Sequence, residues 1–243
     1  SYLEWPLLFL LIVYHNTMKR KRVSIDTRTI QPGDAFIAVG DGHQYCDDAI
    51  AKGATVLDTD LESYAIAHRK KYMGMVIGIT GSFGKTTLKN SITAMLKPLG
   101  VSATEKNFNN EIGVPLTIAN AHLDTPYWVV EMGIRKPGDM ARLQAIVQPD
   151  IAVLSGIGHS HMAFFDSPTH LLTEKLGLLC PTTKDLFYPS TIPDPTPHLP
   201  SPPHCHPVPI ARLIDTNTAI CHALGSHLGI PTEIINAQLQ TVQ

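Results

Sequence analysis

The residues best suited to chemistry lie in the stretch VIGITGSFGKTTLK, from Val76 to Lys89. An apolar run leads into a glycine-rich loop. Glycine lets backbone N–H groups crowd around an anion, and the N-terminus of a following helix attracts phosphate. Lys85 can neutralise the β- and γ-phosphates of ATP, and Thr86 can bind Mg²⁺. The stretch therefore predicts an ATP-binding phosphate loop made of Gly81, Ser82, Phe83, Gly84, Lys85, Thr86 and Thr87.

The loop departs from the common GxxxxGK[ST] pattern at one position. Ile79 stands where the first glycine belongs, and Gly78 and Gly81 flank that position. A tight strand-to-helix turn would explain the glycines, but not GKTT directly after an apolar strand. We therefore favour nucleotide binding. The shifted glycine, and the lack of a guanine-reading NKxD motif, argue against an unrelated phosphate-loop kinase or GTPase.

Three polar residues outside the loop are further candidates. Glu131 ends the apolar run YWVVE, where the carboxyl end of a strand in an open α/β sheet meets ligands. Its carboxylate can hold Mg²⁺, and the alternative is a helix cap or a surface charge. Asn109 and Asn110 lie in a loop with Gly113 and Pro115. Their amides suit polar substrate groups, although Asn and Gly also simply build turns.

The pattern of apolar runs predicts an α/β fold in two parts. Over 23–72 we expect a small N-terminal α/β domain, with short strands around a turn at 31–34 and a helix ending at Gly53. A linker-like stretch, 67–74, follows. Over 73–243 we expect an incomplete ATP-binding domain of the phosphate-loop type. It has a parallel sheet covered on both faces, because apolar strands alternate with helices. The strands are expected at 75–80, 127–133 and 150–158, and the helices at 85–100, 138–148, 217–230 and 231–240.

A proline-rich segment interrupts this order. Residues 181–209 hold ten prolines in 29 positions. Such a segment cannot form a helix and should not form a central strand. We expect an irregular connector or a disordered loop. It contains HCH at 204–206, but adjacent His and Cys lack the usual zinc spacing, so metal binding is not favoured there.

Composition sets further expectations. A net charge of −2 argues against a nucleic-acid partner. Four widely spaced cysteines predict reduced thiols and a cytoplasmic protein, which we expect to be a monomer. Residues 1–22 read as an apolar and basic leader. Its apolar run, 5–14, is shorter than the roughly 20 residues of a membrane span. A buried or disordered leader is therefore favoured over the end of a membrane helix and over membrane contact.

Several ordered motifs resemble one family. GITGSFGKTT is similar to the loop of the Mur ligases, the ATP-dependent amide-forming enzymes of peptidoglycan assembly. NFNNEIGVPLT, VVEMGIRKPGDM and PDIAVLSGIGHSHM resemble the branch that adds D-alanyl-D-alanine to UDP-N-acetylmuramoyl-tripeptide. Upstream, SIDTRTIQPGDAFIAV resembles its UDP-binding domain. NFNNEIGVPLT and the UDP-domain motifs argue against a folate-polyglutamylating relative.

The resemblance implies roles that the residues alone do not reveal. His161 matches a catalytic histidine that binds a second metal ion. Lys175 matches a lysine that is carbamylated and acts as a metal ligand, although on its own it reads as a solvated helix lysine. Asn217 matches an adenine-contacting asparagine. Candidates for the UDP-sugar side are Thr27, Arg28 and His43, and for the remaining substrate contacts Asn109 and Asn110. The implied metal ligands are Thr86, Glu131, His161 and Lys175, with Lys85, His161 and Lys175 catalytic.

The implied reaction passes through an acyl phosphate. A carboxylate of the UDP-linked tripeptide attacks the γ-phosphate of ATP, and the amine of D-alanyl-D-alanine then displaces the phosphate. The family's central domain continues further, and its closing C-terminal domain has no counterpart in these residues. Closure excludes water from a hydrolysable intermediate. The alternative to a ligase is therefore a non-catalytic or hydrolysis-only nucleotide-binding remnant.

Overall fold

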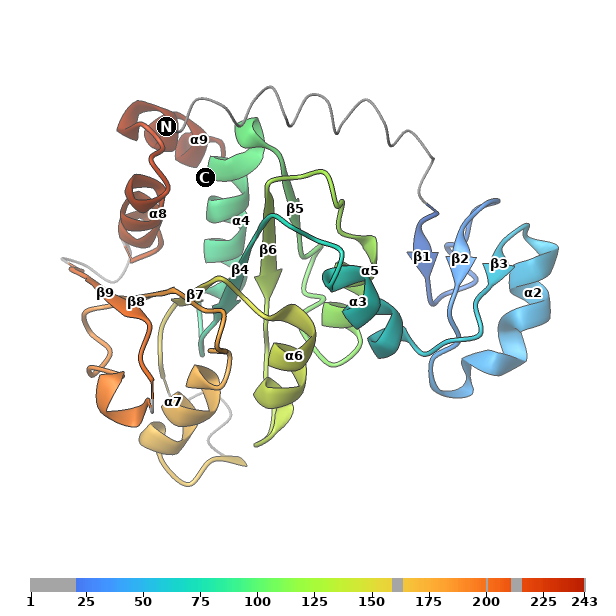
Figure 1. Cartoon of the computed structure of the whole chain (residues 1–243), viewed down its shortest axis with the longest axis horizontal. Helices are drawn as coiled ribbons and strands as arrows, with labels where there is room; N and C mark the ends of the chain where they lie inside the picture. Colours follow the sequence, from blue (N-terminus) through green and yellow to red (C-terminus); the bar gives the residue numbers. More distant parts are fainter. Residues whose placement is uncertain (1–20, 159–163, 200, 211–215, 243) are drawn as a thin grey trace.

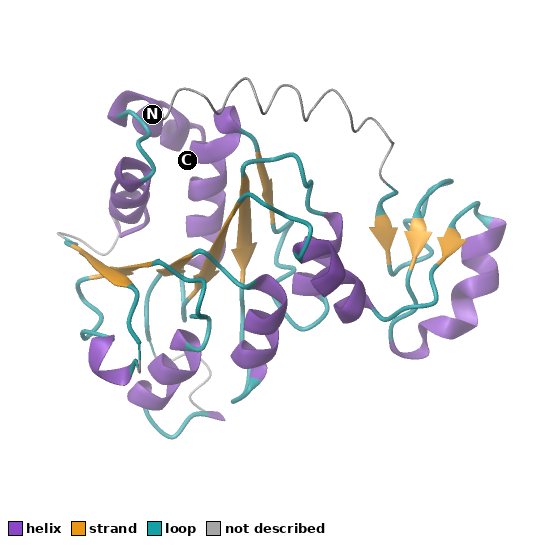
Figure 2. Ribbon diagram, in the orientation of Figure 1, coloured by secondary structure: helices purple, strands orange, loops and turns teal. Residues whose placement is uncertain are grey.

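Two parallel sheets organise the chain. The computed structural model describes residues 21–158, 164–199, 201–210 and 216–242 (Figure 1). The smaller sheet has the strand order β1-β2-β3, and the larger has the order β5-β6-β4-β7-β8-β9. Every described strand pairing in both sheets is parallel. Helices cover both faces of the larger sheet (Figure 2). The predicted α/β class, with a small sheet followed by a larger parallel one, is confirmed.

The small sheet is built from two-residue strands. Its turn forms where the sequence predicts, since Asp34 donates its backbone N–H to the carbonyl of Gln31 at 3.0 Å. The buried side chains of Val23, Ala35 and Ile37 pack with Leu61 and Ala119. The elements are β1 (Val23–Ser24), β2 (Ala35–Phe36), η1 (Gly40–Tyr45), α2 (Cys46–Ala51), β3 (Thr55–Val56) and α3 (Leu61–Arg69).

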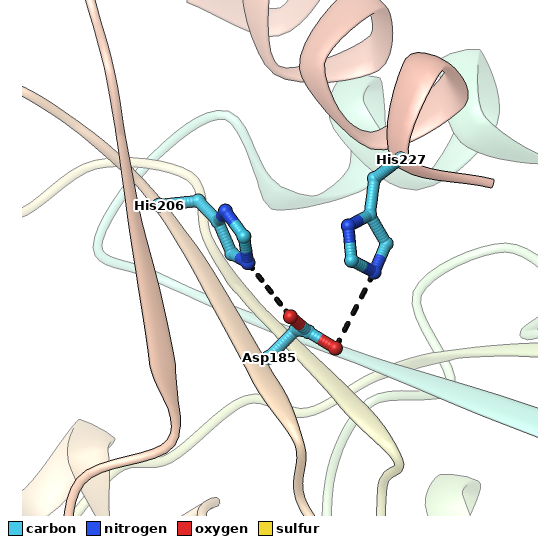
Figure 3. A group of neighbouring side chains, drawn as sticks. All are labelled: Asp185, His206 and His227. Carbon is cyan, nitrogen blue, oxygen red and sulfur yellow. Dashed lines mark hydrogen bonds and ion pairs between the residues drawn. The ribbon is translucent and has the colours of Figure 1, made fainter. Parts of the chain in front are cut away.

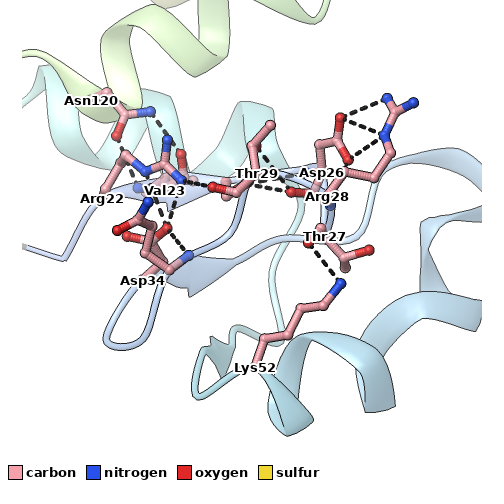
Figure 4. A network of polar contacts seen from close by, with 11 residues as sticks. Arg22, Val23, Asp26, Thr27, Arg28, Thr29, Asp34, Lys52 and Asn120 are labelled. Atoms are coloured by element: carbon pink, nitrogen blue, oxygen red, sulfur yellow. Dashed lines mark hydrogen bonds and ion pairs between the residues drawn. The ribbon is translucent and has the colours of Figure 1, made fainter.

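Polar contacts tie the small sheet to its surroundings (Figure 4). The side chain of Asn120 accepts from the backbone N–H of Val23 and donates to the carbonyl of the same residue, both at 2.9 Å. Arg22 pairs with Asp34 at 2.7 Å and donates to the carbonyl of Thr29. These two contacts join Arg22, the last residue of the expected leader, to the small sheet, because a guanidinium beside a buried carboxylate forms a charge-assisted hydrogen bond. Residues 1–20, with the apolar run, lie outside the described residues.

The large sheet carries the elements that hold the predicted loop. The loop at 81–84 follows a strand and precedes a helix, as the apolar pattern predicts. Glu131 is the last residue of the neighbouring strand. The elements are β4 (Met75–Thr80), α4 (Lys85–Leu96), η2 (Lys97–Leu99), β5 (Val101–Ala103), α5 (Gly113–Asn120), β6 (Tyr127–Glu131), α6 (Asp139–Val147), β7 (Ile151–Leu154), α7 (Pro168–Leu176), β8 (Asp185–Pro189), η4 (Thr196–His198), β9 (His204–Val208), α8 (Thr216–His227), α9 (Thr232–Leu239) and η6 (Gln240–Val242).

Each face of the large sheet has its own core. Apolar residues of α4, α8 and α9 pack on one face, around Ile77, Ile79 and Phe187. Apolar residues of α5, α6 and α7 pack on the other, around Trp128 and Val130. Alternate residues of a strand point to opposite faces, so a strand buried on both sides reads as one apolar run. The burial explains why the sequence pattern located β4, β6 and β7.

Two expectations about local structure were wrong. Residues 67–69 of the supposed linker end helix α3, and Tyr72 is buried, with its ring stacked 3.8 Å from that of Trp128. The loop expected around Gly113 and Pro115 becomes helix α5. Proline is tolerated in the first turn of a helix, where its missing N–H has no intrahelical partner to lose. Burial of one helix face therefore outweighed the linker-like and turn-like composition.

The prediction of an irregular segment over 181–209 was also wrong, because β8 and β9 both form within it. β8 is buried between β7 and β9, and its first four residues contain no proline. On β9, His204 donates its N–H to Lys184, and Ser190 donates to Val208. The backbone N–H and C=O groups of the even-numbered residues of β9 therefore point toward β8. The backbone nitrogen of Pro207, which has no hydrogen to donate, points away from β8, so no hydrogen bond of the ladder is lost. Proline is accepted at such an edge position.

None of the helices in the described ranges is long and apolar enough to span a bilayer.

We predict that Asn120→Ala loosens the small sheet. The change leaves the N–H and carbonyl of the buried residue Val23 without their partners. We expect a loss of about 1–3 kcal/mol in the free energy of unfolding. We also expect faster amide exchange over 23–56, with exchange in β4 and β6 unchanged. Denaturant titration and hydrogen–deuterium exchange measure the two effects.

The matched control is Asn236→Ala, at an exposed position of α9. Equal exchange in β1 of the two variants would show that Asn120 does not fasten the small sheet.

Candidate functional site

The loop between β4 and α4 has a shape that requires glycine at two positions. Gly84 has φ +76°, a left-handed conformation, directly before the first residue of α4. A Cβ at Gly81 would lie 2.0 Å from Ser155 Oγ, a distance that the packing cannot accommodate. The N–H of Ser82 donates to the carbonyl of Gly156 at 2.6 Å. The end of β7 therefore braces a loop that opens onto the N-terminus of a helix, where anions bind.

Two lysines converge on one carbonyl of this loop. Lys85 Nζ donates to the carbonyl oxygen of Gly81 at 3.0 Å, and Lys175 Nζ donates to the same oxygen at 2.9 Å. Lys175 is 1% exposed, so the expectation of a solvated helix lysine was wrong. Its burial lowers the pKa of Lys175 to about 7, and the charge of Lys85 acts in the same direction. A substantial fraction of Lys175 is therefore a neutral, nucleophilic amine near pH 7.

Glu131 forms the negative centre of the site. Its side chain is fully buried, and Oε1 accepts from Thr86 Oγ1 at 3.0 Å and from Asn109 Nδ2 at 2.7 Å. In the part of the chain that the structure describes, Oε2 has no hydrogen-bond partner. Burying an unpaired carboxylate oxygen is costly. An orphaned oxygen beside a threonine hydroxyl matches the hard oxygen ligands that Mg²⁺ prefers. These residues fit a magnesium ion.

Lys89 is a buried residue of this region that the sequence interpretation did not single out. Its Nζ donates to the carbonyls of Thr104 and Lys106 at 2.9 and 3.0 Å, which ties α4 to the loop that carries Asn109. Burial lowers the pKa of Lys89, and the charge of Glu131 partly offsets this. The spacing of four residues between Lys85 and Lys89 could have revealed it, because this spacing places both lysines on the same face of a helix.

The two asparagines of the loop before α5 separate in role. Asn109 points to Glu131, whereas Asn110 Oδ1 accepts from the backbone N–H of Gly113 at 2.9 Å, at the start of α5. Asn110 thus holds the chain at the start of α5, whereas the sequence alternative was a turn built from Asn and Gly. Phe83 is 53% exposed, and its ring lies over Gly156 and Gly158, where an added Cβ would meet it at 2.6 and 3.1 Å.

Asn217 lies next to the loop, at the start of α8. A Cβ placed on Gly84 would lie 3.7 Å from Asn217 Oδ1. Asn217 and Thr87 together line a pocket of about 510 Å³ between α4, α8 and α9. The pocket adjoins the first turn of α4, so it is placed to accept the base of a nucleotide whose phosphates occupy the loop.

His161, the residue expected to bind a second metal ion, lies outside the described residues.

The residues predicted to bind a UDP-sugar belong to the small sheet, which precedes the phosphate loop in the sequence. Thr27 and Arg28 follow β1, and His43 lies in η1 after β2. The carboxyl ends of β1 and β2 share one edge of the sheet because the two strands are parallel. Arg28 is exposed and pairs with Asp26 at 2.7 Å, and Thr27 accepts at its carbonyl from Lys52. The role of these residues in substrate binding stays a prediction.

The fold and the loop together define the class of this domain. A glycine-rich loop joins a central parallel strand to a helix, and a carboxylate ends the adjacent strand at the same edge of the sheet. Ligands bind at this edge in open α/β sheets. The larger domain is therefore a phosphate-loop α/β domain.

Comparison with known proteins shows which family part of this chain resembles. Residues 79–188 match the Mur ligase middle domain. The UDP-N-acetylmuramoyl-tripeptide–D-alanyl-D-alanine ligases of Synechocystis and of Bacillus subtilis are each 33% identical over 183 residues. Each match covers 65% of this chain and 40% of the relative. Residues 79–188 are therefore similar to a Mur ligase middle domain, and the chain resembles these ligases over about two fifths of their length.

Solved structures show the same fold. MurF of Acinetobacter baumannii superposes with a TM-score of 0.79 at 22% identity, covering 91% of this chain and 63% of that protein. MurF of Thermotoga maritima, solved in complex with ADP, gives a TM-score of 0.74 at 24% identity, with 87% and 64% covered. The fold therefore extends beyond the matched middle domain.

We predict a pH-dependent stability difference caused by Lys175. Its pKa is about 7 in the folded chain against an ordinary value of 10.5. Between these values the unfolded chain binds a proton that the folded chain does not, so stability rises with pH. Relative to Lys175→Met, the wild-type free energy of unfolding should rise by roughly 2–4 kcal/mol from pH 7 to pH 10, at about 1.4 kcal/mol per pKa unit.

Denaturant titrations at several pH values, in buffer purged of carbon dioxide, measure this difference. The control is Lys136→Met at an exposed lysine. A wild-type profile parallel to that of Lys175→Met would show that the Lys175 amine titrates normally in the folded chain.

Proposed function

We propose that this chain binds ATP with Mg²⁺ and serves the ATP-dependent ligation of D-alanyl-D-alanine to UDP-N-acetylmuramoyl-tripeptide. The observation that carries the nucleotide site is the buried Glu131 carboxylate. One of its oxygens binds Thr86 of the loop, and the other lacks a partner within the described ranges. A cation at this position would satisfy that oxygen. The names of the relatives supply the substrates of the proposal.

The roles of the nucleotide-binding residues follow from their positions. The N–H groups at the start of α4 point toward the loop opening and suit phosphate oxygens. Lys85 is placed to leave the Gly81 carbonyl and pair with the β- and γ-phosphates, since a phosphate is a stronger partner than a neutral carbonyl. Thr86 and Glu131 would hold Mg²⁺, which neutralises charge on the transferring phosphoryl group. Asn217 would contact the adenine.

Lys175 is placed for the chemical step. Carbamylation needs a neutral amine, which attacks carbon dioxide through nitrogen and releases a proton to solvent. The product carries one negative charge where an ammonium would repel a cation. The depressed pKa of Lys175 and its position 2.9 Å from the loop carbonyl support this modification. The carbamate would serve as a metal ligand with His161, and a cation held there would offset the negative charge that develops when the substrate carboxylate attacks the γ-phosphate.

A second candidate function is nucleotide binding with hydrolysis but without ligation. The chain spans about 40% of the length of its curated relatives, so groups that would bind the dipeptide and exclude water are not identified among these residues. An acyl phosphate that meets water is hydrolysed. The two candidates differ only in whether phosphate release needs D-alanyl-D-alanine.

A cytoplasmic location suits both candidates. The four cysteines are free thiols, and none of them forms a disulfide. Free thiols are typical of a reducing compartment.

We predict that Glu131→Gln removes the Mg²⁺ dependence of ATP binding, because the amide keeps the shape of the side chain and loses its charge.

We also predict that Lys85→Ala weakens ATP binding at least about tenfold with Mg²⁺ present, which corresponds to 1.4 kcal/mol. Isothermal titration calorimetry with and without Mg²⁺ measures both effects. Phosphate release is then followed with UDP-N-acetylmuramoyl-tripeptide alone and with both substrates.

The controls are Glu105→Gln and Lys97→Ala, which change exposed residues of the same charge. Wild-type affinity in Lys85→Ala would refute the phosphate-loop assignment. A rate of phosphate release that is the same with and without D-alanyl-D-alanine would favour the hydrolysis-only candidate. A ligated product that forms only when the dipeptide is present would favour the ligase.

We predict that Lys175 takes up carbon dioxide. Incubation with ¹³C-bicarbonate near neutral pH should give a carbamate signal in the ¹³C NMR spectrum that is absent from Lys175→Met and present in Lys136→Met. Added Mg²⁺ should strengthen the signal, since a bound cation stabilises the carbamate. A spectrum of the wild type identical to that of Lys175→Met would exclude carbamylation, leaving Lys175 as a neutral hydrogen-bond donor.

A further inference from the structure

Three metal-ligating side chains gather on the sheet face opposite to α7, outside the nucleotide site (Figure 3). Asp185 is the first residue of β8, His206 lies on β9 and His227 is the last residue of α8. In the strand register His206 pairs with Phe187, two residues beyond Asp185. Residues two apart on a strand share a face, so β8 and β9 present both groups to the helix that covers them.

The distances suit a small coordination site. His206 Nε2 lies 2.7 Å from Asp185 Oδ1, and His227 Nε2 lies 3.4 Å from Asp185 Oδ2. One ligand atom from each residue lies within 4.8 Å of the other two. In a tetrahedral zinc site with bonds of about 2.0–2.1 Å, ligand atoms are about 3.4 Å apart. A cation therefore needs only a small opening of the His206–Asp185 pair.

The imidazole rings are held in place by an aromatic neighbour. Phe187 is buried and stacks on His206 with ring centroids 4.4 Å apart. The same ring meets His227 edge-on at 5.4 Å. Ligands whose rings are already oriented lose less conformational freedom when they bind a metal ion.

The exposure of the cluster leaves a route for an ion. The Asp185 side chain is 9% exposed, whereas those of His206 and His227 are 35% and 36% exposed. His204 Nδ1 lies 3.9 Å from Asp185 Oδ1, and its side chain is 88% exposed. A buried carboxylate with imidazoles at the surface provides a negative anchor and open positions, one of which His204 can fill by rotating.

We propose that Asp185, His206 and His227 bind a divalent transition-metal ion of the zinc type. Two imidazole nitrogens and one carboxylate oxygen suit Zn²⁺, whereas Mg²⁺ prefers oxygen ligands alone. The ion would join the edge strand β9 and the end of α8 to the buried strand β8. It would thereby stabilise the proline-rich end of the sheet, because an ion that binds only the folded chain raises its stability. The site is independent of ATP binding.

The test is a competition titration of the full chain against a chromogenic zinc indicator, with millimolar Mg²⁺ present to fill the oxygen-ligand site at Glu131. The variants are His206→Gln and His227→Asn, and the matched control is His198→Gln at an exposed histidine of η4. We expect one Zn²⁺ per wild-type and control chain and binding at least about tenfold weaker in both variants. Zn²⁺ should also slow amide exchange in β9 and at the end of α8.

Zinc X-ray absorption on the wild type keeps the proposal testable if the variants fail to fold. Two imidazole ligands in the spectrum support the site, and oxygen ligands alone overturn it. Absence of stoichiometric Zn²⁺ binding, or binding that the two variants leave unchanged, would show that the three side chains form only a hydrogen-bonded cluster.

Discussion

A carboxylate with no exposure to solvent organises the phosphate-loop end of this molecule. Glu131 has no exposed surface, so its charge must be compensated by protein groups or by a cation. Thr86 and Asn109 satisfy one oxygen, and the charges of Lys85 and Lys89 act on it through space. These contacts join α4, the loop before α5 and the end of β6. The second oxygen, without a partner among the described residues, is the atom that the proposed cation would satisfy.

The second constraint is the crowding of positive charge around the loop. Lys85 and Lys175 share the Gly81 carbonyl, although they come from different helices. Burial, together with the charge of Lys85, lowers the pKa of Lys175 to about 7. Phosphates would relieve the repulsion around Lys85, and a carbamate on Lys175 would reverse the sign of one partner.

The edge of the large sheet formed by β8 and β9 is stabilised differently from the phosphate-loop end. β8 and β9 form in a segment rich in proline, because the prolines fall at the end of β8 or where β9 turns its backbone outward. A cluster of one carboxylate and two imidazoles lies over this edge. The proposed metal ion would add to the backbone pairing that already joins β8 and β9. The nucleotide site and this cluster thus lie at separate parts of one sheet.

The local pattern of the chain determined the phosphate loop, strands β4, β6 and β7, helices α4, α6, α8 and α9 and the position of Glu131, because each follows from short-range apolar periodicity and glycine placement. The motifs around Asn107–Thr117 also pointed to the family. Only the tertiary structure decided that Lys175 is buried beside Gly81, that Asn109 rather than Asn110 reaches Glu131, and that residues 181–209 add two strands. The same holds for the meeting of Asp185, His206 and His227. Burial, strand register and long-range contacts depend on segments far apart in the chain, and no local pattern of residues records them.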